Sequence, residues 1–236
     1  MIGCVCALLL GTCSRRAQRF RDFSMLTPIS TQDVLVLGFM GGRDSWNNAK
    51  VGVGRFAKRL RDLNLPGVHV ETVENMRREL ALELVRRAFD RNRDGTLDLQ
   101  ECRSTRLILY GQSFGGAAVV KFAQQLKPLG IPVMLTVQVD SVGLNDEVIP
   151  SNVTAAANLF QRDGLIIHGP KSIRPEDPNA TKIVGNFQFS YRDRTIDLSG
   201  VPWHKKSFRT DHTRMDLDPA VWAKVEELIL LVLARD

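Results

Sequence analysis

The sequence predicts an α/β fold with a mostly parallel central sheet and helices on both faces. Short apolar runs that end in glycine-rich or polar turns are typical of buried strands, and they alternate with segments whose apolar residues recur at helical spacing. This alternation is the pattern of a parallel sheet covered on both sides. The chain has 236 residues, of which 44% are hydrophobic. It is therefore long enough for one well-filled core and fits one domain better than two.

The first half of the chain contains two of the expected strands and two of the expected helices. The strands are residues 33–42 (DVLVLGFMGG), which end in a glycine-rich turn, and residues 68–73 (VHVETV). A helix is expected within residues 47–67, where it stops at Asn64 and Pro66-Gly67, and a strongly amphipathic one over residues 74–90. The positions on their apolar faces are Val53, Phe56, Leu60 and Leu63 in the first helix, and Leu80, Leu82, Leu84, Val85 and Phe89 in the second.

The second half repeats the same alternation. Strand 106–110 (RLILY) leads to a helix over residues 115–130, which is followed by the buried strand 131–140 (IPVMLTVQVD). The last helix is expected over residues 218–234, with proline in its first turn, where a missing N–H is tolerated. In such sheets the active cleft lies at the carboxyl ends of the strands. Two further segments are candidate strands or extended stretches, residues 164–169 (GLIIHG) and 182–191 (KIVGNFQFSY).

The N-terminus predicts a leader or signal-like segment over residues 1–24, followed by the folded domain over residues 25–236. Its apolar stretch, in MIGCVCALLLGTC, is about a dozen residues long, too short to span a bilayer but suited to a signal-peptide core. This pattern favours export, as a periplasmic, lipoprotein or secreted chain with a lipid anchor as one form, over a cytoplasmic protein. The alternatives are a hydrophobic tail or a start codon assigned in the wrong place. No later segment is apolar enough to cross a membrane.

Charge and cysteine content exclude several classes of protein. The formal net charge is +6, but the basic residues do not form a stripe interleaved with aromatics, so nucleic-acid binding is not expected. Three of the four cysteines (Cys4, Cys6 and Cys13) lie in the first thirteen residues, whereas a disulfide framework would spread them through the fold. The chain contains no CxxC pair, so zinc is not indicated.

Residues 111–115 (GQSFG) match G-x-S-x-G between an expected strand and an expected helix. A serine on this sharp turn has its hydroxyl raised clear of its surroundings, and side chains at Gly111 and Gly115 would clash. The helix that follows contributes free N–H groups and the positive end of its dipole. Ser113 is therefore predicted to be a nucleophile; the alternative is a plain helix cap.

With this motif in this context, the chain resembles the α/β-hydrolase family from about Asp33 to its C-terminus. The resemblance implies a serine hydrolase, esterase-, lipase- or thioesterase-like, with its triad in the order Ser, acid, His. It also implies an oxyanion site made of the Phe114 N–H and a second N–H from the loop after an early strand. GFMGG (residues 38–42) fills that place, with the N–H of Phe39 or Met40 as the candidate donor. An ordinary glycine turn is the alternative.

The general base is expected to be a histidine just before the last helix. Of the four histidines, His212 lies in what reads as a loop leading directly into that helix, where an imidazole can take the proton of Ser113. His204 is the second candidate. His69 lies inside an expected strand and is expected to be structural, whereas His168 stays ambiguous.

The acid is predicted at Asp140, which ends the strand after the nucleophile helix. A carboxylate at the end of a buried strand needs a partner, and an imidazole N–H would be one. Most of the family places the acid after the next strand, which leaves other aspartates open. Asp211 adjoins His212 and is poorly placed to orient its own neighbour. The open alternatives are Asp177, Asp193 and Asp197.

Residues 90–101 (DRNRDGTLDLQE) fit the twelve-residue EF-hand pattern, which wraps oxygen ligands around one calcium ion. Gly95 permits the sharp turn. After the loop there is room for about one helical turn, and the chain has no second copy of the pattern, so the expectation is a structural staple and not a calcium switch. The expected ligands are Asp90, Asn92, Asp94, Thr96 through its carbonyl, Asp98 and Glu101.

These patterns predict a serine hydrolase that cleaves an ester or related acyl bond of a small molecule or lipid, with calcium in a structural role and no cofactor needed for the chemistry. Residues 141–164 are a candidate cover for the cleft. The alternative hypothesis is a catalytically silent hydrolase fold that serves as a calcium-binding or interaction module.

Overall fold

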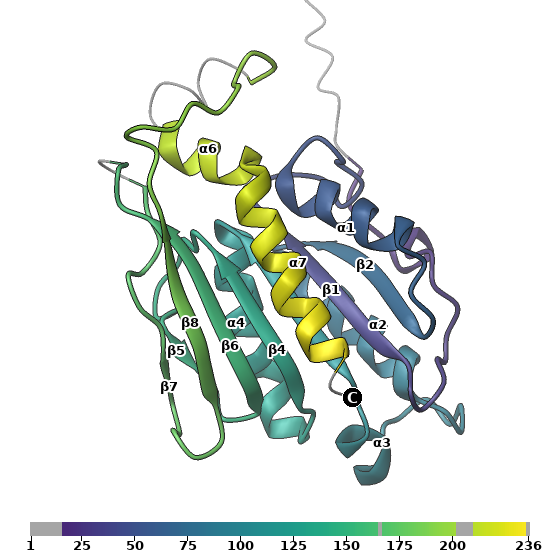
Figure 1. Cartoon of the computed structure of the whole chain (residues 1–236). Coiled ribbons are helices and arrows are strands. Elements are labelled where there is room, and N and C mark those ends of the chain that lie inside the picture. The colour runs from purple at the N-terminus through teal and green to yellow at the C-terminus, as the bar shows by residue number, and fades with distance from the viewer. Residues whose placement is uncertain (1–15, 165–166, 202–209, 235–236) are drawn as a thin grey trace, which may run out of the picture.

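The computed structural model describes residues 16–164, 167–201 and 210–234 (Figure 1). It confirms the predicted fold class, because a parallel six-stranded sheet lies between two layers of helices in an α/β-hydrolase-like sandwich. The strand order is β2-β1-β3-β4-β6-β8, and every neighbouring pair is parallel. The strands of this sheet are β1 (Val34–Met40), β2 (Val68–Glu74), β3 (Leu107–Gln112), β4 (Val133–Val139), β6 (Val153–Gln161) and β8 (Lys182–Phe189). A second, two-stranded sheet pairs β5 (Val148–Ile149) with β7 (Arg174–Pro175).

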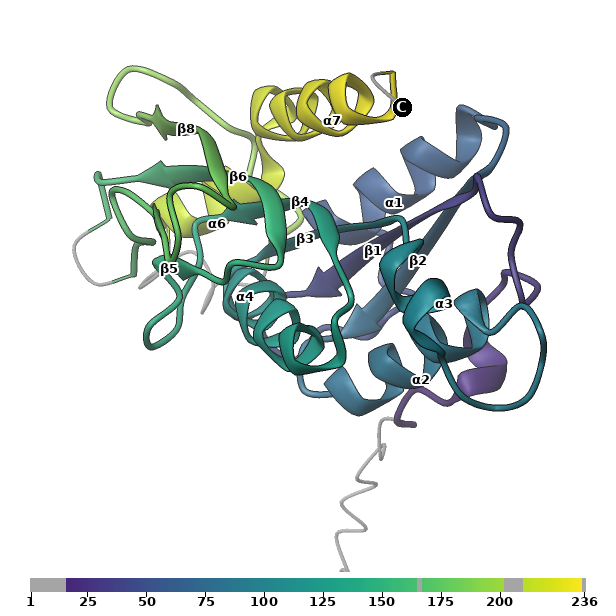
Figure 2. The same cartoon turned by 90° about the horizontal axis from the view of Figure 1, so that it is seen from below.

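The helices divide between the two faces of the sheet, as the view from below shows (Figure 2). On one face, α2 and α4 bury their apolar sides in one cluster with Leu35, Leu37 and Phe39 of β1, to which α3 adds Cys102. On the other face, α1, α6 and α7 pack over Val36 and Met40 of the same strand. The bounds are η1 (Phe20–Asp22), α1 (Gly52–Asp62), α2 (Arg78–Phe89), α3 (Leu99–Arg103), α4 (Phe114–Leu126), η2 (Lys127–Leu129), α6 (Thr210–Leu217) and α7 (Pro219–Leu233).

Most of the expected elements are present, with shorter helices than the sequence predicts. Leu63 lies just beyond α1 with 41% of its surface exposed, so it is not a core contact. Leu80 is only partly buried in α2, whereas its predicted companions on that helix are buried. Asp218 caps α7 by accepting the Ala220 N–H at 2.9 Å, which agrees with a helix start at this position.

One central strand differs from the expectation. Residues 153–161 form β6, paired on both sides with β4 and β8, so nine residues of the segment expected to cover the cleft are part of the sheet. Conversely, the described part of residues 164–169 contains no strand. The alanine-rich start of β6 has low strand propensity, and its buried Asn158 and Gln161 break the apolar run that indicates a core strand.

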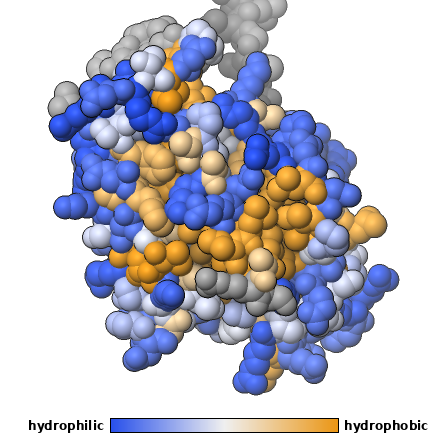
Figure 3. All heavy atoms as spheres, viewed as in Figure 1, coloured by the Kyte–Doolittle hydropathy of each residue, from blue (hydrophilic) through white to orange (hydrophobic). Residues whose placement is uncertain are grey.

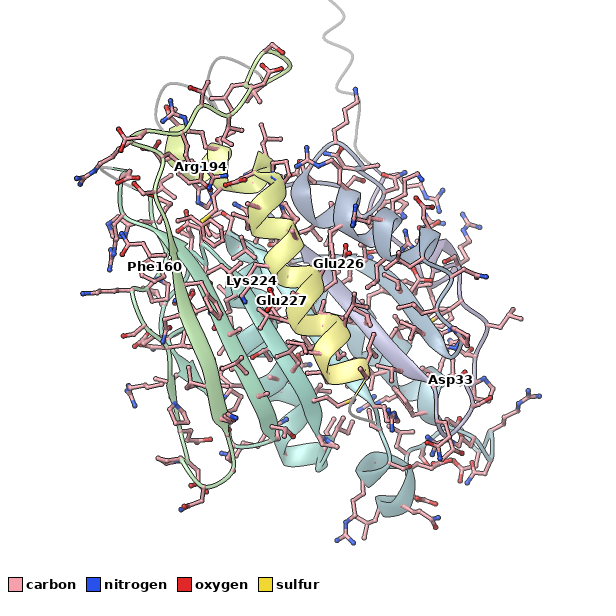
Figure 4. All side chains as sticks on the ribbon, in the orientation of Figure 1. Asp33, Phe160, Arg194, Lys224, Glu226 and Glu227 are labelled. Carbon is pink, nitrogen blue, oxygen red and sulfur yellow. The ribbon has the colours of Figure 1, made fainter. Side chains whose placement is uncertain are left out.

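Helix α7 is tied to α1 at the surface. Glu226 lies on the side of α7 that faces α1 (Figure 4) and accepts a hydrogen bond from Arg59 Nη2 at 3.0 Å. Hydrophobic side chains gather at the surface along the C-terminal half of α7 (Figure 3), where Leu231 is 47% exposed. Within the described ranges, every helix is too short or too polar to span a bilayer.

The described start of the chain packs onto the domain. Gln18 is fully buried and donates to the Thr72 carbonyl at 2.9 Å, and the backbone N–H of Ser24 donates to Glu71 at 2.6 Å. Residues 16–24, which fall within the predicted leader, are therefore in contact with β2. The apolar N-terminal stretch with its three cysteines lies outside the described residues, and Cys102 is a buried free thiol.

Candidate active site

Ser113 lies on the turn between β3 and α4, at the carboxyl end of the sheet. Its backbone has φ 58° and ψ −126°, a region that residues other than glycine rarely occupy and that costs of order 1–3 kcal/mol. A backbone hydrogen bond to β4 stabilises the turn, because the Ser113 N–H donates to the Val139 carbonyl at 3.0 Å. Its side chain is 8% exposed and faces a pocket of about 590 Å³.

The glycines around Ser113 are required by close backbone contacts. A Cβ on Gly115 would overlap the carbonyl oxygen of Phe39 in β1, and a Cβ on Gly111 would overlap the carbonyl of Gly115. A Cβ on Gly116 would lie 2.8 Å from Cβ of Ser141. The start of α4 can therefore approach β1 and β4 only because these positions carry no side chain.

His212 is brought to the same pocket by α6, a helix and not the loop that the sequence suggested. Its Nδ1 lies 2.7 Å from Oδ2 of Asp140, and both side chains are buried. Asp140 follows β4 with a φ of 41°. The Gly169 N–H donates to its Oδ1 at 2.6 Å, and the Gln161 amide donates to its Oδ2 at 2.9 Å. These two donors hold the carboxylate in place, and its Oδ2 is positioned to accept the Nδ1–H of the imidazole.

The other ring nitrogen of His212 contacts an amide. Nε2 of His212 lies 3.1 Å from Nε2 of Gln112, the buried residue that precedes the serine. With Nδ1 protonated toward Asp140, Nε2 is the acceptor of the Gln112 N–H. The lone pair that would take a proton from Ser113 is therefore shared with Gln112 in this conformation.

The glycine turn after β1 forms part of the pocket wall. Gly41 and Gly42 line it, and a Cβ built on Gly41 would lie 3.5 Å from the Ser113 Cβ. Phe39 and Met40, the expected oxyanion donors, are instead the last two residues of β1 and are fully buried. Asn75 fixes this turn by donating to the Met40 carbonyl at 2.8 Å and to the Gly42 carbonyl at 2.6 Å.

Two carboxylates and a guanidinium complete the pocket wall. Asp44 and Arg43 follow the glycine turn, and Asp216 comes from the end of α6. Burial raises the pKa of Asp216 above its ordinary value, while the Gly52 N–H at 3.0 Å acts in the opposite direction.

The remaining histidines have partners elsewhere. His69 contacts the Asp33 carboxylate at 2.8 Å near the amino end of β1. His168 contacts Arg162 at 2.6 Å, and His204 lies outside the described residues.

The alternative acids are likewise engaged away from His212. Asp177 and Asp197 accept backbone N–H groups two residues further on, both within exposed turns. Asp211 pairs with Arg214 at 2.8 Å. Asp193 is exposed. Of the carboxylates considered from the sequence, the structure brings Asp140 to the imidazole.

The Asp-rich loop connects α2 to α3, and its carboxylates accept its own backbone N–H groups. Asp90 accepts the Gly95 N–H at 2.9 Å, and Asp94 accepts the Thr96 N–H at 2.9 Å, which holds the pKa of Asp94 below its ordinary value. Glu101 is buried and accepts N–H groups of Arg91 at 2.8 Å and of Asp98 at 3.1 Å. In the described part of the chain, no group of three or more His, Cys, Asp or Glu side chains is arranged to hold a metal ion.

Three amide side chains around the pocket have no signal in the sequence. Gln112 occupies a variable place in G-x-S-x-G, and Asn75 and Gln161 follow or end other strands. Their partners lie 100, 35 and 21 positions away. The only pattern that could have indicated them is their place at the carboxyl ends of the strands.

Comparisons with known proteins identify a similar solved structure but no family. No model of a protein family matches the sequence, and no curated protein matches it. Among solved structures, a dienelactone hydrolase-like promiscuous phosphotriesterase from metagenomic libraries is similar over 89% of this chain and 88% of its own, with 13% identity and a TM-score of 0.40. The fold class therefore depends on the strand order and helix layers of this chain, and its chemistry on the geometry of its own residues.

Proposed function

We propose that this protein is a serine hydrolase that cleaves an ester or related acyl bond. The observation that carries the proposal is the meeting in one pocket of Ser113, on its strained turn, with His212, whose Nδ1 lies 2.7 Å from the buried Asp140. A serine, an imidazole and a carboxylate in this relation form a nucleophile, a base and a group that orients the base.

The reaction then proceeds in two steps. Ser113 Oγ bonds to the carbonyl carbon while its proton passes to Nε2 of His212, which must first leave the amide of Gln112. The C–O bond to the alcohol breaks as His212 returns the proton to that oxygen, which leaves an acyl group on Ser113. Water, with its proton taken by His212, attacks the acyl carbon and releases the acid, and the proton returns to Ser113.

The proposed oxyanion donors are the N–H of Phe114, at the start of α4, and an N–H of the turn at Gly41 and Gly42. The turn replaces Phe39 and Met40 in this role because it lines the pocket and lies against Ser113. Phe114 is the first residue of an α-helix, so its N–H has no partner within the helix and the helix dipole favours negative charge there.

Labelling with a fluorophosphonate tests the proposal directly, since this probe modifies an activated serine. We expect labelling of the wild type, none of Ser113→Ala, and strongly reduced labelling of His212→Ala. A series of p-nitrophenyl esters of increasing chain length, assayed on the same three proteins, measures turnover. Equal labelling of wild type and Ser113→Ala, or Ser113-independent turnover, would exclude Ser113 as the nucleophile.

A silent hydrolase fold is the second candidate. The contact that favours it is the one between His212 Nε2 and Gln112, since a base that stays bound to this amide cannot take the serine proton. Under this hypothesis the wild type remains unlabelled at every probe concentration although it is folded.

We further propose that the loop of residues 90–101 binds Ca²⁺ as a structural ion. Its support is the spacing of oxygen donors and the turn at Gly95, whose φ of +89° brings its N–H onto Asp90. Glu101 would have to exchange its backbone donors for the ion. The ion would fix the link from α2 through α3 to β3, the strand that carries Ser113, and it takes no part in the chemistry.

A further inference from the structure

A second hollow adjoins the active-site pocket at the start of α4. It has a volume of about 260 Å³, and Phe114 lines both it and the pocket that holds Ser113. Asn75 in its wall holds the carbonyl of Gly42, which belongs to the wall of the pocket. When the carbonyl carbon of a substrate lies at Ser113, the second hollow is therefore about the length of one side chain away from that carbon. We call this hollow the acyl groove; its lining includes Asn75, Met76, Arg78, Phe114, Lys121 and Leu144.

The walls of the acyl groove are apolar and open to solvent. Met76 is 81% exposed, Leu144 is 83% exposed and Phe114 is 49% exposed. These are three of the nine exposed large hydrophobic side chains in the described ranges, and they come from three different segments of the chain. Apolar side chains that converge on one hollow beside a reactive group indicate a binding site for an apolar chain.

The two hollows differ in the charged side chains that line them. The acyl groove is lined by the cations Arg78 and Lys121 and by no acidic side chain, and neither cation forms an ion pair with any described residue. The carboxylate next to Arg78 in the chain, Glu79, accepts a hydrogen bond from Gln125 at 2.8 Å. The pocket around Ser113 is lined instead by two carboxylates and one guanidinium. An anionic group is therefore more favoured in the acyl groove than in the pocket.

We propose that the acyl groove binds the acyl chain of the substrate, and that this chain ends in an anionic group recognised by Arg78 and Lys121. The inference rests on the proposed hydrolysis at Ser113 and names its substrate class, esters of acids whose chain carries a second, negatively charged end. The apolar wall contacts the methylene groups, and the cations contact the terminal carboxylate. The alcohol half of the ester then lies in the pocket beside Asp44 and Asp216, and it leaves from there.

Two esters that differ only in the end of the acyl chain test this inference. One is p-nitrophenyl hexanoate, and the other is the mono-p-nitrophenyl ester of adipic acid, with the same six-carbon chain and a terminal carboxylate. The measured quantity is the ratio of kcat/KM for the adipate half-ester to that for the hexanoate. We expect the ratio to exceed one in the wild type and to fall about three-fold in Arg78→Gln and in Lys121→Gln, the effect of an exposed charge pair.

Control variants separate this effect from a general loss of charge. Arg78→Lys keeps the cation and is expected to retain most of the ratio. Lys182→Gln removes an exposed cation at the start of β8, the opposite end of the sheet from Ser113, and is expected to leave the ratio unchanged. Raising the ionic strength is expected to lower the wild-type ratio, because salt screens exposed charges. It should have little effect on the ratio of the double variant that carries both Arg78→Gln and Lys121→Gln.

The outcomes distinguish this inference from the proposed hydrolysis. If hexanoate turnover depends on Ser113 but the ratio is the same in wild type and both glutamine variants, the inference is wrong and the hydrolase stands. If the variants instead weaken cleavage of a butyrate ester whose nitrophenol carries a carboxylate, the groove binds the leaving group and the inference is also wrong. If neither ester is cleaved in a Ser113-dependent way, both proposals fail together.

Discussion

His212 Nδ1 lies 2.7 Å from Oδ2 of Asp140, although 72 positions separate the two residues in the chain. Two different elements bring them together: β4 ends at Val139, directly before Asp140, and α6 carries His212 to the carboxyl end of the sheet. Asp140 is fully buried and accepts two further hydrogen bonds, from Gly169 and Gln161. These two hydrogen bonds fix the carboxylate independently of the imidazole. A carboxylate fixed in this way favours a single tautomer of the ring.

Asp140→Asn is expected to remove most of the activity while the protein remains folded. The asparagine can still accept the Gly169 N–H through its oxygen, but its amide would face Nδ1 and favour the tautomer with the proton on Nε2. That tautomer cannot take the proton of Ser113, so kcat should fall by about 10⁴-fold. Steady-state assay of an ester cleaved by the wild type, with circular dichroism as the folding control, checks this. A loss smaller than ten-fold would show that another group orients His212.

Asn75→Asp is expected to lower kcat for an uncharged ester such as p-nitrophenyl hexanoate, with little change in KM. The aspartate has the same shape but no N–H, so the Met40 and Gly42 carbonyls lose their common donor. The glycine turn that lies against Ser113 would then be less fixed. We expect a fall of about ten- to a hundred-fold, less than the 10²- to 10³-fold loss that follows removal of an oxyanion donor itself.

Asn152→Asp is the matched control for this change. Asn152 also donates to two backbone carbonyls, of Ala123 at 3.0 Å and of Ile131 at 2.9 Å, but it lies before β6 at the other end of the sheet. Both variants should lower the melting temperature, whereas only Asn75→Asp should lower kcat. Similar kcat values for the two variants would mean that Asn75 has only a structural role.

Asp216→Asn is expected to change how stability depends on pH. Burial raises the pKa of Asp216 above its ordinary value, so the folded protein keeps this proton at a pH where the unfolded chain has lost it. The free energy of unfolding therefore decreases as the pH rises from the ordinary aspartate pKa through the raised one. Asparagine has no proton to lose there, and its oxygen can still accept the Gly52 N–H.

Thermal unfolding of wild type and Asp216→Asn at several pH values tests this sign. The variant should be more stable than the wild type above the raised pKa, and the difference should disappear below the ordinary pKa of an aspartate. If the variant were equally destabilised at every pH, the carboxylate would be stabilising at this position. Its interactions would then compensate for the cost of its burial.

The sequence predicts the parts of this molecule that follow from local patterns. The strand–turn–helix around Ser113 can be predicted because its close backbone contacts require glycine. At Gly115, for example, a side chain would overlap the backbone of β1. Asp140 can be predicted as a site residue because it directly follows the apolar run of a buried strand. These signals need no knowledge of distant partners, and they predict the succession of strands and helices along the chain through β4 and the sheet edge where the pocket lies.

The remaining features depend on contacts that no local pattern encodes. β6 was not expected because Asn158 and Gln161 look like surface residues, whereas in the fold Asn158 donates to the Pro170 carbonyl at 2.8 Å and Gln161 donates to Asp140. The loop after β1 also begins later than the sequence predicts, at Gly41 and not at Gly38, for a related reason. The strand continues through Met40 because both of its neighbours pair with it almost to its end, and pairing is a property of the assembled sheet.

Removal of calcium is expected to lower the melting temperature of the wild type. An ion that binds only the folded chain stabilises it by about 2.7 kcal/mol at a hundred times its Kd, which corresponds to about 5–10 °C for a domain of this size. Differential scanning fluorimetry with excess chelator, and with chelator followed by excess Ca²⁺, measures the shift. Mg²⁺ at the same concentration should restore less of it, because Mg²⁺ requires a stricter octahedral set of ligands.

Asp94→Asn is the variant that makes this test specific to the loop. Its side-chain oxygen can still accept the Thr96 N–H, so the loop keeps its own hydrogen bonds, but one negative charge of the proposed ligand set is lost. Asp197→Asn is the matched control, since Asp197 also accepts a backbone N–H two residues on, in an exposed turn outside the loop. We expect the calcium-dependent shift to be reduced in Asp94→Asn and unchanged in Asp197→Asn. A wild-type melting temperature that is the same with chelator and with calcium would show that the loop is held by its own backbone hydrogen bonds alone.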